Sequence, residues 1–200
     1  MRQTERWLHA PLAALCAVSL AAVTPVMAQS NLPAVLRLPG VVNFGQISSS
    51  YYRGGEPSRE GVLALAKLGI KTVIDLQMEV DAQESGLVGK AGMHYVRIPM
   101  TTHTPPTASQ QAQFLSLVND PARQPVYVHC REGRHRTGVM TALYRMTQDR
   151  WTADQAFREM KQYDFGWDIL HSEFKRFVYA YVAPVAGASS PVIVAARATD

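Results

Sequence analysis

Hydrophobic and polar residues along the middle of this chain predict short buried strands that alternate with amphipathic helices. Three runs are rich in β-branched and apolar residues, are five or six residues long and are bounded by Gly, Pro or polar residues, as buried strands are. They are Lys71–Leu76, His94–Ile98 and Pro125–His129. A further short strand is expected over Ser50–Arg53, because two glycines and a proline follow it.

Apolar residues that recur every three or four positions predict helices between and after these strands. Ser58 is expected to cap the first helix, and two capping boxes, Thr107 with Gln110 and Thr152 with Gln155, are expected to open later ones. Further helices are expected directly after the last strand and near residues 170–181. This alternation predicts the α/β class, as a single domain with a central, mostly parallel sheet flanked by helices.

The first 28 residues have the features of an export signal. They begin with basic residues, continue with an apolar run over Pro11–Val23 and end in small residues up to Ala28. A retained membrane anchor is the alternative, but the apolar run is shorter than the about 20 residues that a membrane-spanning helix needs. We therefore expect cleavage after Ala28, export to the periplasm or the medium, and no stable membrane insertion afterwards.

Composition divides the rest of the chain into three parts. Residues 29–49 are rich in Pro, Ser and Gly and are expected to be a lead-in segment, residues 50–182 carry the strand and helix patterns, and residues 183–200 are expected to be a flexible tail. Cleavage of the signal removes Cys16 and leaves Cys130 as the one thiol, so we expect no internal disulfide.

The charge of the chain favours anionic ligands without specifying them. The 200 residues carry a formal net charge of +4, and the pI is about 9.2. No basic cluster lies outside the stretch His129–Gly138, so nucleic-acid binding is not expected.

The stretch His129–Gly138 lies where a predicted buried strand passes into a predicted helix. Ligands of open α/β sheets bind beyond the carboxyl ends of the strands, where backbone N–H groups of a loop and of a helix N-terminus converge on an anion. Cys130 lies at that point, and the same donors would keep it a thiolate at neutral pH. Arg136, six positions further on, could bind two phosphate oxygens with its guanidinium.

This stretch matches the signature of cysteine-dependent phosphatases, HC-x5-R-[ST], in its HCxxGxxRTG form. The six matching positions are His129, Cys130, Gly133, Arg136, Thr137 and Gly138. Two further segments, Arg53–Pro57 and Leu68–Leu76, resemble the amino-terminal half of bacterial and atypical dual-specificity phosphatases. The resemblance covers about residues 50–165, and it implies that residues 50–182 form a dual-specificity phosphatase-like catalytic domain.

The resemblance implies a role for each matching residue. Cys130 would be the nucleophile, Arg136 would bind the phosphate and stabilise the transition state, and Thr137 would hydrogen-bond the sulfur as it leaves. His129 and Gly138 would order the loop rather than react. The phosphate would be bound by the loop residues Arg131, Glu132, Gly133, Arg134, His135 and Arg136. We expect no metal and no cofactor, because the loop donors and the arginine supply the positive field.

The general acid departs from the family pattern. Most relatives carry an aspartate in the loop after the strand that precedes the signature, whereas residues 99–119 contain no carboxylate here. His103 is the candidate proton donor of that loop, since a histidine titrates near neutral pH. Other candidates are Glu132, His135, Asp164 and Asp168. A leaving group that is a weak base would need no acid at all.

Two substrate classes fit the signature. Phosphate monoesters of tyrosine, or of serine and threonine, come first. The run Gly133–Gly138 is similar to that of plant and fungal atypical phosphatases that act on inositol pyrophosphates, and Arg131, Arg134 and His135 would make the pocket basic enough for such polyanions. In both cases the expected partner is a phosphorylated substrate, either a phosphoprotein or a polyphosphorylated small molecule.

Two alternatives of other classes stay open. A catalytically dead module could bind phosphate with the same loop, although the intact Cys130, Arg136 and Thr137 argue against it. A thiol enzyme of the rhodanese or arsenate reductase type is the second. Arsenate reduction normally uses further cysteines, and a sulfurtransferase loop does not require the Arg-Thr-Gly ending.

No role in the reaction is assigned to three groups of residues outside the loop. Tyr51, Tyr52 and Arg53 could flank the pocket, and an edge strand explains them equally well. A solvated loop or helix face would carry Glu79, Asp81 and Glu84. The aromatic residues expected in the core are Trp151, Tyr163, Phe165 and Trp167.

Overall fold

A computed structural model of the chain describes residues 36–79 and 81–183, and the following concerns those residues. The predicted signal over residues 1–28, the first part of the lead-in and all of the predicted tail except residue 183 lie outside them. Cleavage, export and tail flexibility therefore stay predictions. Among the described helices, none is both long and apolar enough to cross a membrane.

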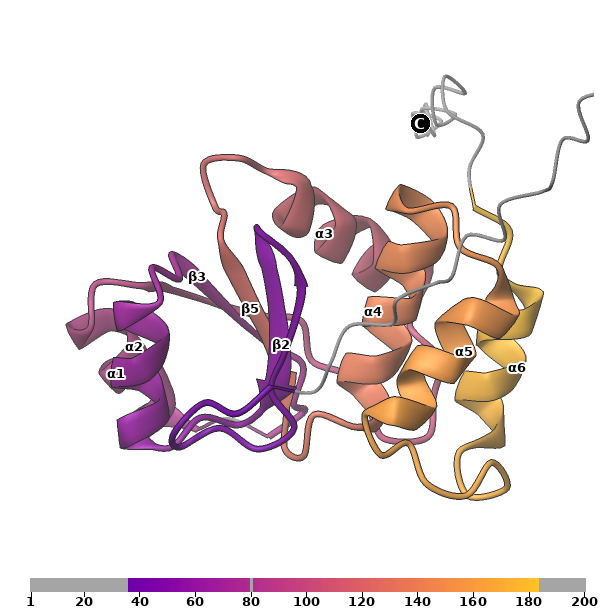
Figure 1. Cartoon of the computed structure of the whole chain (residues 1–200), viewed down its shortest axis with the longest axis horizontal. Coiled ribbons are helices and arrows are strands. Elements are labelled where there is room, and N and C mark those ends of the chain that lie inside the picture. Colours follow the sequence, from indigo (N-terminus) through magenta and orange to yellow (C-terminus); the bar gives the residue numbers. More distant parts are fainter. Residues whose placement is uncertain (1–35, 80, 184–200) are drawn as a thin grey trace, which may run out of the picture. The chain divides into compact units, whose positions relative to one another are not determined.

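Five strands form one sheet in the order β1-β2-β5-β3-β4 (Figure 1). Their bounds are β1 Gly45–Ser48, β2 Tyr51–Gly55, β3 Thr72–Asp75, β4 His94–Arg97 and β5 Val126–Cys130. Strand β1 pairs with β2 in antiparallel fashion, and the pairs β2–β5, β5–β3 and β3–β4 are parallel. The sheet is thus mostly parallel, as the sequence predicts.

Six helices accompany the strands. Their bounds are α1 Arg59–Lys67, α2 Ala82–Lys90, α3 Ala108–Asn119, α4 His135–Gln148, α5 Ala153–Gln162 and α6 Ser172–Ala180. The predicted caps are confirmed: the Ser58 hydroxyl accepts from the backbone of α1, and both predicted capping boxes are formed at α3 and α5. Local sequence therefore sets where these three helices begin.

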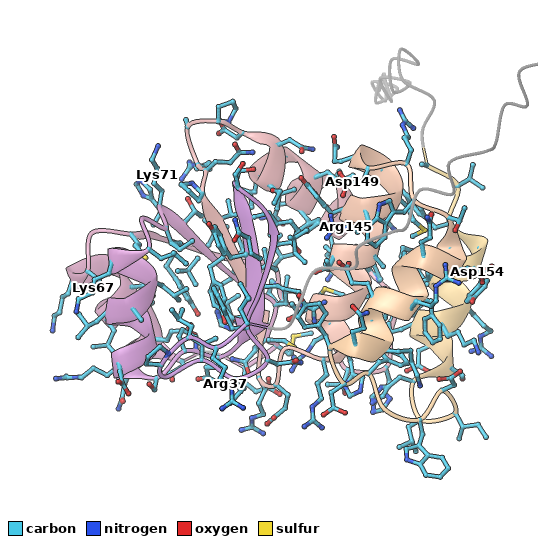
Figure 2. All side chains as sticks on the ribbon, in the orientation of Figure 1. Arg37, Lys67, Lys71, Arg145, Asp149 and Asp154 are labelled. Atoms are coloured by element: carbon cyan, nitrogen blue, oxygen red, sulfur yellow. The ribbon has the colours of Figure 1, made fainter. Side chains whose placement is uncertain are left out.

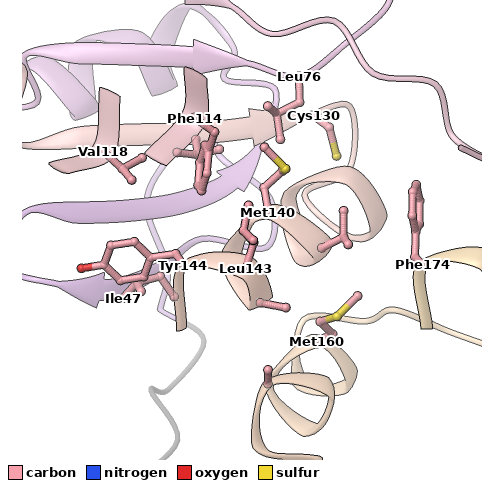
Figure 3. Packing of buried hydrophobic residues seen from close by; sticks show 14 of the residues in the cluster. Ile47, Leu76, Phe114, Val118, Cys130, Met140, Leu143, Tyr144, Met160 and Phe174 are labelled. Atoms are coloured by element: carbon pink, nitrogen blue, oxygen red, sulfur yellow. The ribbon is translucent and has the colours of Figure 1, made fainter. Parts of the chain in front are cut away.

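Helices cover both faces of the sheet (Figure 1). Helices α1 and α2 pack on one face around Val62, Leu65 and Val88. Helices α3 and α4 pack on the other face, and α5 and α6 pack against α4. Figure 3 shows part of this second cluster, in which Phe114 and Met140 lie beside β5. The predicted α/β class with a sheet between helical layers is confirmed.

A buried arginine joins α4 to α5. Arg145 Nη2 lies 2.8 Å from Glu159 Oε1, and its Nη1 lies 2.7 Å from Asp149 Oδ2 (Figure 2). Its guanidinium carbon also lies 4.3 Å from the centroid of the Trp151 ring. The two carboxylates compensate the charge of this buried arginine, and the Trp151 ring packs against its guanidinium.

The amino-terminal side of the sheet differs from the prediction in two ways. The sheet begins at Gly45, inside the segment expected to be a lead-in, so β2 lies between β1 and β5 and is not the edge strand that Tyr51 and Tyr52 predict. Strand β2 also continues through Gly54 and Gly55, which pair with His129 and Cys130 of β5. Pairing with a partner strand, which local propensity cannot show, decides both points.

Candidate active site

Strand β5 lies at the centre of the sheet, and Cys130 is its last residue. Its neighbours β2 and β3 both run parallel to it, with Gly55 opposite Cys130 and Asp75 opposite His129. The helices that follow β2 and β3 lie on one face, and the helix that follows β5 lies on the other (Figure 1). The connections thus diverge beyond the end of β5, which is where open α/β sheets bind ligands.

A four-residue loop, residues 131–134, joins Cys130 to the first turn of α4. Gly133 in this loop has a φ of +68°, in the left-handed region. A Cβ atom at this position would lie 2.4 Å from the carbonyl carbon of Gly54. Only glycine satisfies both the backbone angle and this close approach of two backbones. The signature glycine therefore sets the path of the loop.

Side chains from β2 and from the turn before β1 hold this loop from the outside. Arg53, which is fully buried, donates from Nη2 to the carbonyl oxygen of Gly133. Asn43 donates from Nδ2 to the same oxygen at 3.3 Å and to the carbonyl oxygen of Tyr163 at 2.8 Å. The sequence offers no signal for Asn43, which lies in the expected lead-in. Arg53 is expected either beside the pocket or on an edge strand, and it lies beside the loop on an inner strand.

Cys130 is 3% exposed, and it lies at the end of β5 (Figure 3). Burial by itself raises the pKa of this thiol. The neighbouring Thr137 hydroxyl, the backbone of Thr137 and Gly133, and the charge of Arg136 lower it, and the net pKa is lowered. The direction agrees with the thiolate that the sequence predicts.

Arg136 in the first turn of α4 is 6% exposed and donates from Nη1 to the carbonyl oxygen of Met100 at 3.2 Å. The same Nη1 lies 3.9 Å from Oε2 of Glu79. Glu79 follows β3, and its backbone is held by Arg97, which donates to the carbonyl oxygens of Glu79 and Gln77 at 2.8 Å each. An exposed carboxylate thus lies beside Arg136, although the chain offers none over residues 99–119.

His129 lies directly before Cys130 and is fully buried. Its Nε2 lies 2.9 Å from Oε1 of Glu84 on α2, which is itself buried. Tyr95 donates to the second oxygen of Glu84 at 3.3 Å and to Asp75 at 2.9 Å. Burial lowers the pKa of His129, but the hydrogen bond and charge of Glu84 outweigh it, so the pKa is raised.

The expectation that Glu84 lies on a solvated face is therefore wrong. Glu84 and Val88 are the buried residues of α2, four positions apart on one face of the helix. This spacing is the signal that could have placed Glu84 inward. Asp81 does behave as expected, because it caps α2 by accepting hydrogen bonds from Gln83 and Glu84.

The rim of the loop is less basic than the sequence predicts. Arg134 Nη2 lies 2.9 Å from Oδ2 of Asp164, so an acidic side chain offsets its charge. The Nε2 atom of His135 lies 3.0 Å from the carbonyl oxygen of Phe165. Burial and the neighbouring His171 lower the pKa of His135 to about 4, which leaves it neutral at pH 7. Arg131 and Glu132 are exposed.

His103 lies on the exposed loop between β4 and α3. Its Nδ1 is 3.4 Å from Oε1 of Glu173, and its ring stacks on that of His171 with centroids 5.2 Å apart. These contacts direct it toward the start of α6. Asp168, another candidate acid, lies between Lys161 and Lys175 at 2.7 Å from each.

The aromatic residues near this rim divide into two groups. Tyr163 and Phe165 are fully buried, as expected for core residues. Trp167 is 81% exposed, so its expected place in the core is wrong. It follows Gly166, whose φ of +78° turns the chain outward after α5.

Residues 41–176 match the family described as "DSP-PTPase phosphatase fused to NAD+ Kinase". The match covers more than half of the chain and includes the whole loop after Cys130. The chain therefore belongs to this family of dual-specificity-type phosphatases, and the family expected from the signature is confirmed.

Three relatives illustrate the range of this family. The protein named tyrosine-protein phosphatase OCA1 of Mycosarcoma maydis is 32% identical over 141 residues, which cover 66% of this chain and 87% of OCA1. Dual specificity protein phosphatase TpbA of Pseudomonas aeruginosa is 27% identical over 176 residues, covering 82% of this chain and 76% of TpbA. Inositol diphosphatase SIW14 of Saccharomyces cerevisiae is 27% identical over 129 residues, covering 62% of this chain and 46% of SIW14.

The fold agrees with these sequence matches. The crystal structure of TpbA is similar with a TM-score of 0.66 at 25% identity, over 76% of this chain and 92% of that structure. The chain is thus a phosphatase of the dual-specificity type, while the names of its relatives differ in the substrate that they state.

Proposed function

We propose that this chain hydrolyses phosphate monoesters through a cysteinyl-phosphate intermediate. The observation that carries the proposal is Cys130, with its lowered pKa, at the point where the central strand passes into α4. Thiolates are good nucleophiles toward phosphorus at a site that donates hydrogen bonds to the phosphate oxygens.

The reaction has two steps. In the first, Sγ of Cys130 attacks phosphorus, the ester P–O bond breaks, and the alcohol leaves with a proton. In the second, water attacks phosphorus and gives a proton to the group that protonated the alcohol, the P–S bond breaks, inorganic phosphate is released, and the thiolate is restored. The Thr137 hydroxyl, which already lowers the pKa of the thiol, stabilises the departing sulfur.

Arg136 stabilises the negative charge on the equatorial oxygens. A guanidinium carries five N–H donors, and the hydrogen bond to Met100 uses one of them, so a fork remains for two phosphate oxygens. The backbone N–H groups of the loop and of the first turn of α4 add further donors. This positive field requires no metal ion, and we expect chelators to leave hydrolysis unchanged.

We propose Glu79 as the proton donor to the leaving group, in preference to His103. Glu79 lies 3.9 Å from the guanidinium of Arg136, which binds the group that is transferred. The contacts of His103 are with Glu173 and His171 on the side of α6. A general acid must come within hydrogen-bond distance of the leaving oxygen, and this criterion favours Glu79.

Phosphate monoesters, with phosphotyrosine first, are the proposed substrates. The pairing of Arg134 with Asp164 and the neutral state of His135 remove much of the basic rim that favoured inositol pyrophosphates. The similarity to SIW14 keeps inositol pyrophosphates as the second candidate. A panel of phosphopeptides, phosphoinositides and inositol pyrophosphates, compared by kcat/KM, distinguishes the two.

Three measurements test the enzyme. Hydrolysis of p-nitrophenyl phosphate should be inhibited by orthovanadate and lost in Cys130→Ser, with the loss exceeding about 1000-fold because no other nucleophile is available. Cys130→Ser should still bind phosphopeptides. If the wild-type chain hydrolyses no phosphate ester while both proteins bind phosphopeptides equally, the chain is a binding module and the proposal is wrong.

Two matched variants test the acid. Glu79→Gln should lower kcat on an alkyl phosphate by about 100-fold and have a much smaller effect on p-nitrophenyl phosphate, whose phenolate leaves without a proton. His103→Asn should leave both rates near wild type. The opposite pattern would assign the acid to His103.

We also propose that the chain is exported and processed after Ala28, on the sequence features of its first residues. Expression of the full chain in a bacterial host, followed by cell fractionation and amino-terminal sequencing, tests this. The expected product begins at Gln29 and lies outside the cytoplasm. An unprocessed cytoplasmic product would contradict the proposal.

A further inference from the structure

Three potential metal ligands come together at the rim of the active site, from two segments that are distant in sequence. His103 lies on the loop between β4 and α3, His171 is the residue directly before α6, and Glu173 lies in the first turn of α6. One ligand atom from each lies within 4.8 Å of the other two. Two histidines and a glutamate are a ligand set that Zn²⁺ uses in proteins.

The distances between these atoms fit a tetrahedral ion. Ligands about 2.1 Å from a tetrahedral zinc ion lie about 3.4 Å from one another. The Nδ1 atom of His103 is 3.4 Å from Oε1 of Glu173, and Nδ1 of His171 is 3.8 Å from the same oxygen. Two edges of the tetrahedron are therefore close to their required length without any movement of the backbone.

The carboxylate offers a second, independent observation. Oε1 of Glu173 is buried and accepts no hydrogen bond from any residue that the structure describes. A buried carboxylate oxygen without a donor is costly, and a cation is one of the partners that relieves this cost. His171 and Glu173 are both mostly buried, whereas His103 is exposed and can admit an ion from solvent.

The other cluster of the same residue types differs in its access to solvent. Asp75, Glu84 and His129 also lie within ligand distance of one another, and Oε1 of Glu84 likewise accepts no hydrogen bond from any residue that the structure describes. All three residues are buried, however, and Tyr95 and Arg97 donate hydrogen bonds to the carboxylates. None of the three opens that cluster to solvent, whereas His103 is exposed and opens the cluster at the rim.

We propose that His103, His171 and Glu173 bind a divalent transition-metal ion of the Zn²⁺ type, with water as the fourth ligand. Nδ1 of His171 donates to the carbonyl oxygen of Thr102 at 3.2 Å. On metal binding its proton moves to Nε2, and the freed lone pair binds the metal. The ion joins the loop that follows β4 to α6, and so stiffens the segment next to Met100, the partner of Arg136. It takes no part in phosphoryl transfer.

Direct binding of Zn²⁺ tests the proposal. The protein is the full chain with both cysteines replaced by serine, Cys16→Ser and Cys130→Ser, because thiolates bind zinc themselves. Isothermal titration at neutral pH should show one equivalent of Zn²⁺ bound, and the bound ion should raise the thermal unfolding temperature. Absence of binding would overturn the proposal.

Single substitutions identify the ligands. In the same background, His103→Asn, His171→Asn and Glu173→Gln should each weaken Zn²⁺ binding by about 100-fold or more, since even outer-shell partners are worth 10- to 100-fold. His94→Asn is the control, because His94 is an exposed histidine at the opposite end of a strand and should change nothing. Unchanged affinity in His103→Asn and Glu173→Gln would place the ion elsewhere and refute the assignment.

Cobalt provides a spectroscopic check on the chain with its cysteines intact. Co²⁺ bound by nitrogen and oxygen ligands absorbs in the visible range without an intense sulfur-to-metal charge-transfer band. That spectrum is expected, and Glu173→Gln should abolish it. A charge-transfer band that disappears in Cys130→Ser would show that the active-site thiolate, and not this cluster, is the ligand.

Discussion

Two histidines flank the loop at Cys130, and their pKa values are shifted in opposite directions. His129, at the end of β5, is fully buried beside the carboxylate of Glu84, and its pKa is raised. His135, the first residue of α4, is half-buried beside His171, and its pKa is lowered to about 4. Both lose solvent, and the difference lies in the neighbour, which is an anion for one and another histidine for the other.

This difference shows how the second layer of residues distributes charge around the loop. The raised pKa of His129 favours its charged form, and the interaction of that form with the neighbouring Cys130 thiolate contributes to the shift. The neutral His135 leaves the rim with less positive charge than the motif suggests. A histidine in a signature therefore has no fixed charge until its neighbours are known.

Gly133→Ala should have the largest effect on stability and activity, because Gly133 sets the path of the chain between the two histidines. Its new Cβ would lie 2.4 Å from backbone atoms of Gly54, at a φ of +68°. We expect the free energy of unfolding to fall by more than about 2 kcal/mol and kcat/KM to fall by about 100-fold, since small displacements of catalytic groups have effects of that size. Denaturant titration and steady-state kinetics measure both.

Gly69→Ala is the matched control. Gly69 also has a positive φ, of +85°, but no other residue lies within 4 Å of the position of its Cβ. Strain alone should cost about 1 kcal/mol and leave kcat/KM unchanged. Equal loss of activity in the two variants would show that the close approach at Gly133 is unimportant.

Glu84→Gln should remove the cause of the raised pKa of His129. Removing the carboxylate from a buried pair should destabilise the protein by about 3 kcal/mol. The pKa of His129 would then fall, and the pKa of the Cys130 thiol would rise. We expect alkylation of Cys130 by iodoacetamide at pH 6 to slow by about tenfold, which corresponds to about one pKa unit.

The control for Glu84→Gln is Glu159→Gln, which removes a carboxylate that is equally buried but pairs with Arg145. It should lose similar stability and keep the alkylation rate. The sign of the pH effect also distinguishes the variants. Because the folded pKa of His129 is raised, its pair with Glu84 stabilises the protein fully below about pH 6.5, and this stabilisation is lost as the pH rises through the raised pKa. Glu84→Gln should remove that decline.

His135→Gln tests the other end of the loop. In the wild type, the pKa of His135 is about 4 in the folded state and near the ordinary value of 6.5 in the unfolded state. As the pH falls, His135 therefore binds a proton in the unfolded chain before it does so in the folded protein. This group therefore costs stability as the pH falls from about 6.5 to about 4. Gln can still donate to Phe165 but does not titrate, and the loss of stability over this range should be smaller in the variant. His94→Gln, at an exposed position, should retain the wild-type slope.

Asp164→Asn should have the smallest effect. The pair between Asp164 and Arg134 is largely exposed, so its loss should change stability by less than about 1 kcal/mol. The freed arginine should raise kcat/KM for an inositol pyrophosphate by about twofold relative to p-nitrophenyl phosphate at low salt, and the gain should disappear at high salt. No change at low salt would show that Arg134 does not face the substrate.

Much of the fold follows from local sequence. The strands β3, β4 and β5 and the capped starts of α1, α3 and α5 are predicted from residues within a few positions of each other. The signature around Cys130 likewise lies in one stretch, so its glycine, cysteine and arginine can be recognised without knowledge of the rest of the chain.

The residues that support the loop could not be predicted, because each comes from a distant part of the chain. Asn43, Arg53 and Glu84 lie between about 45 and 90 positions before the residues that they contact. The same holds for Glu79 beside Arg136 and for His103 beside Glu173. The local sequence around these residues does not predict which distant residues they contact.

The sequence alone determined the family, the type of fold and the residues of the signature, because these depend on local propensity and on a contiguous motif. Only the tertiary structure decided that β2 is an inner strand, that Glu84 is buried, and that the pKa of His129 is raised while that of His135 is lowered. The physical reason is that burial and Coulomb interactions depend on neighbours in space, and those neighbours are set by how the helices pack on the sheet.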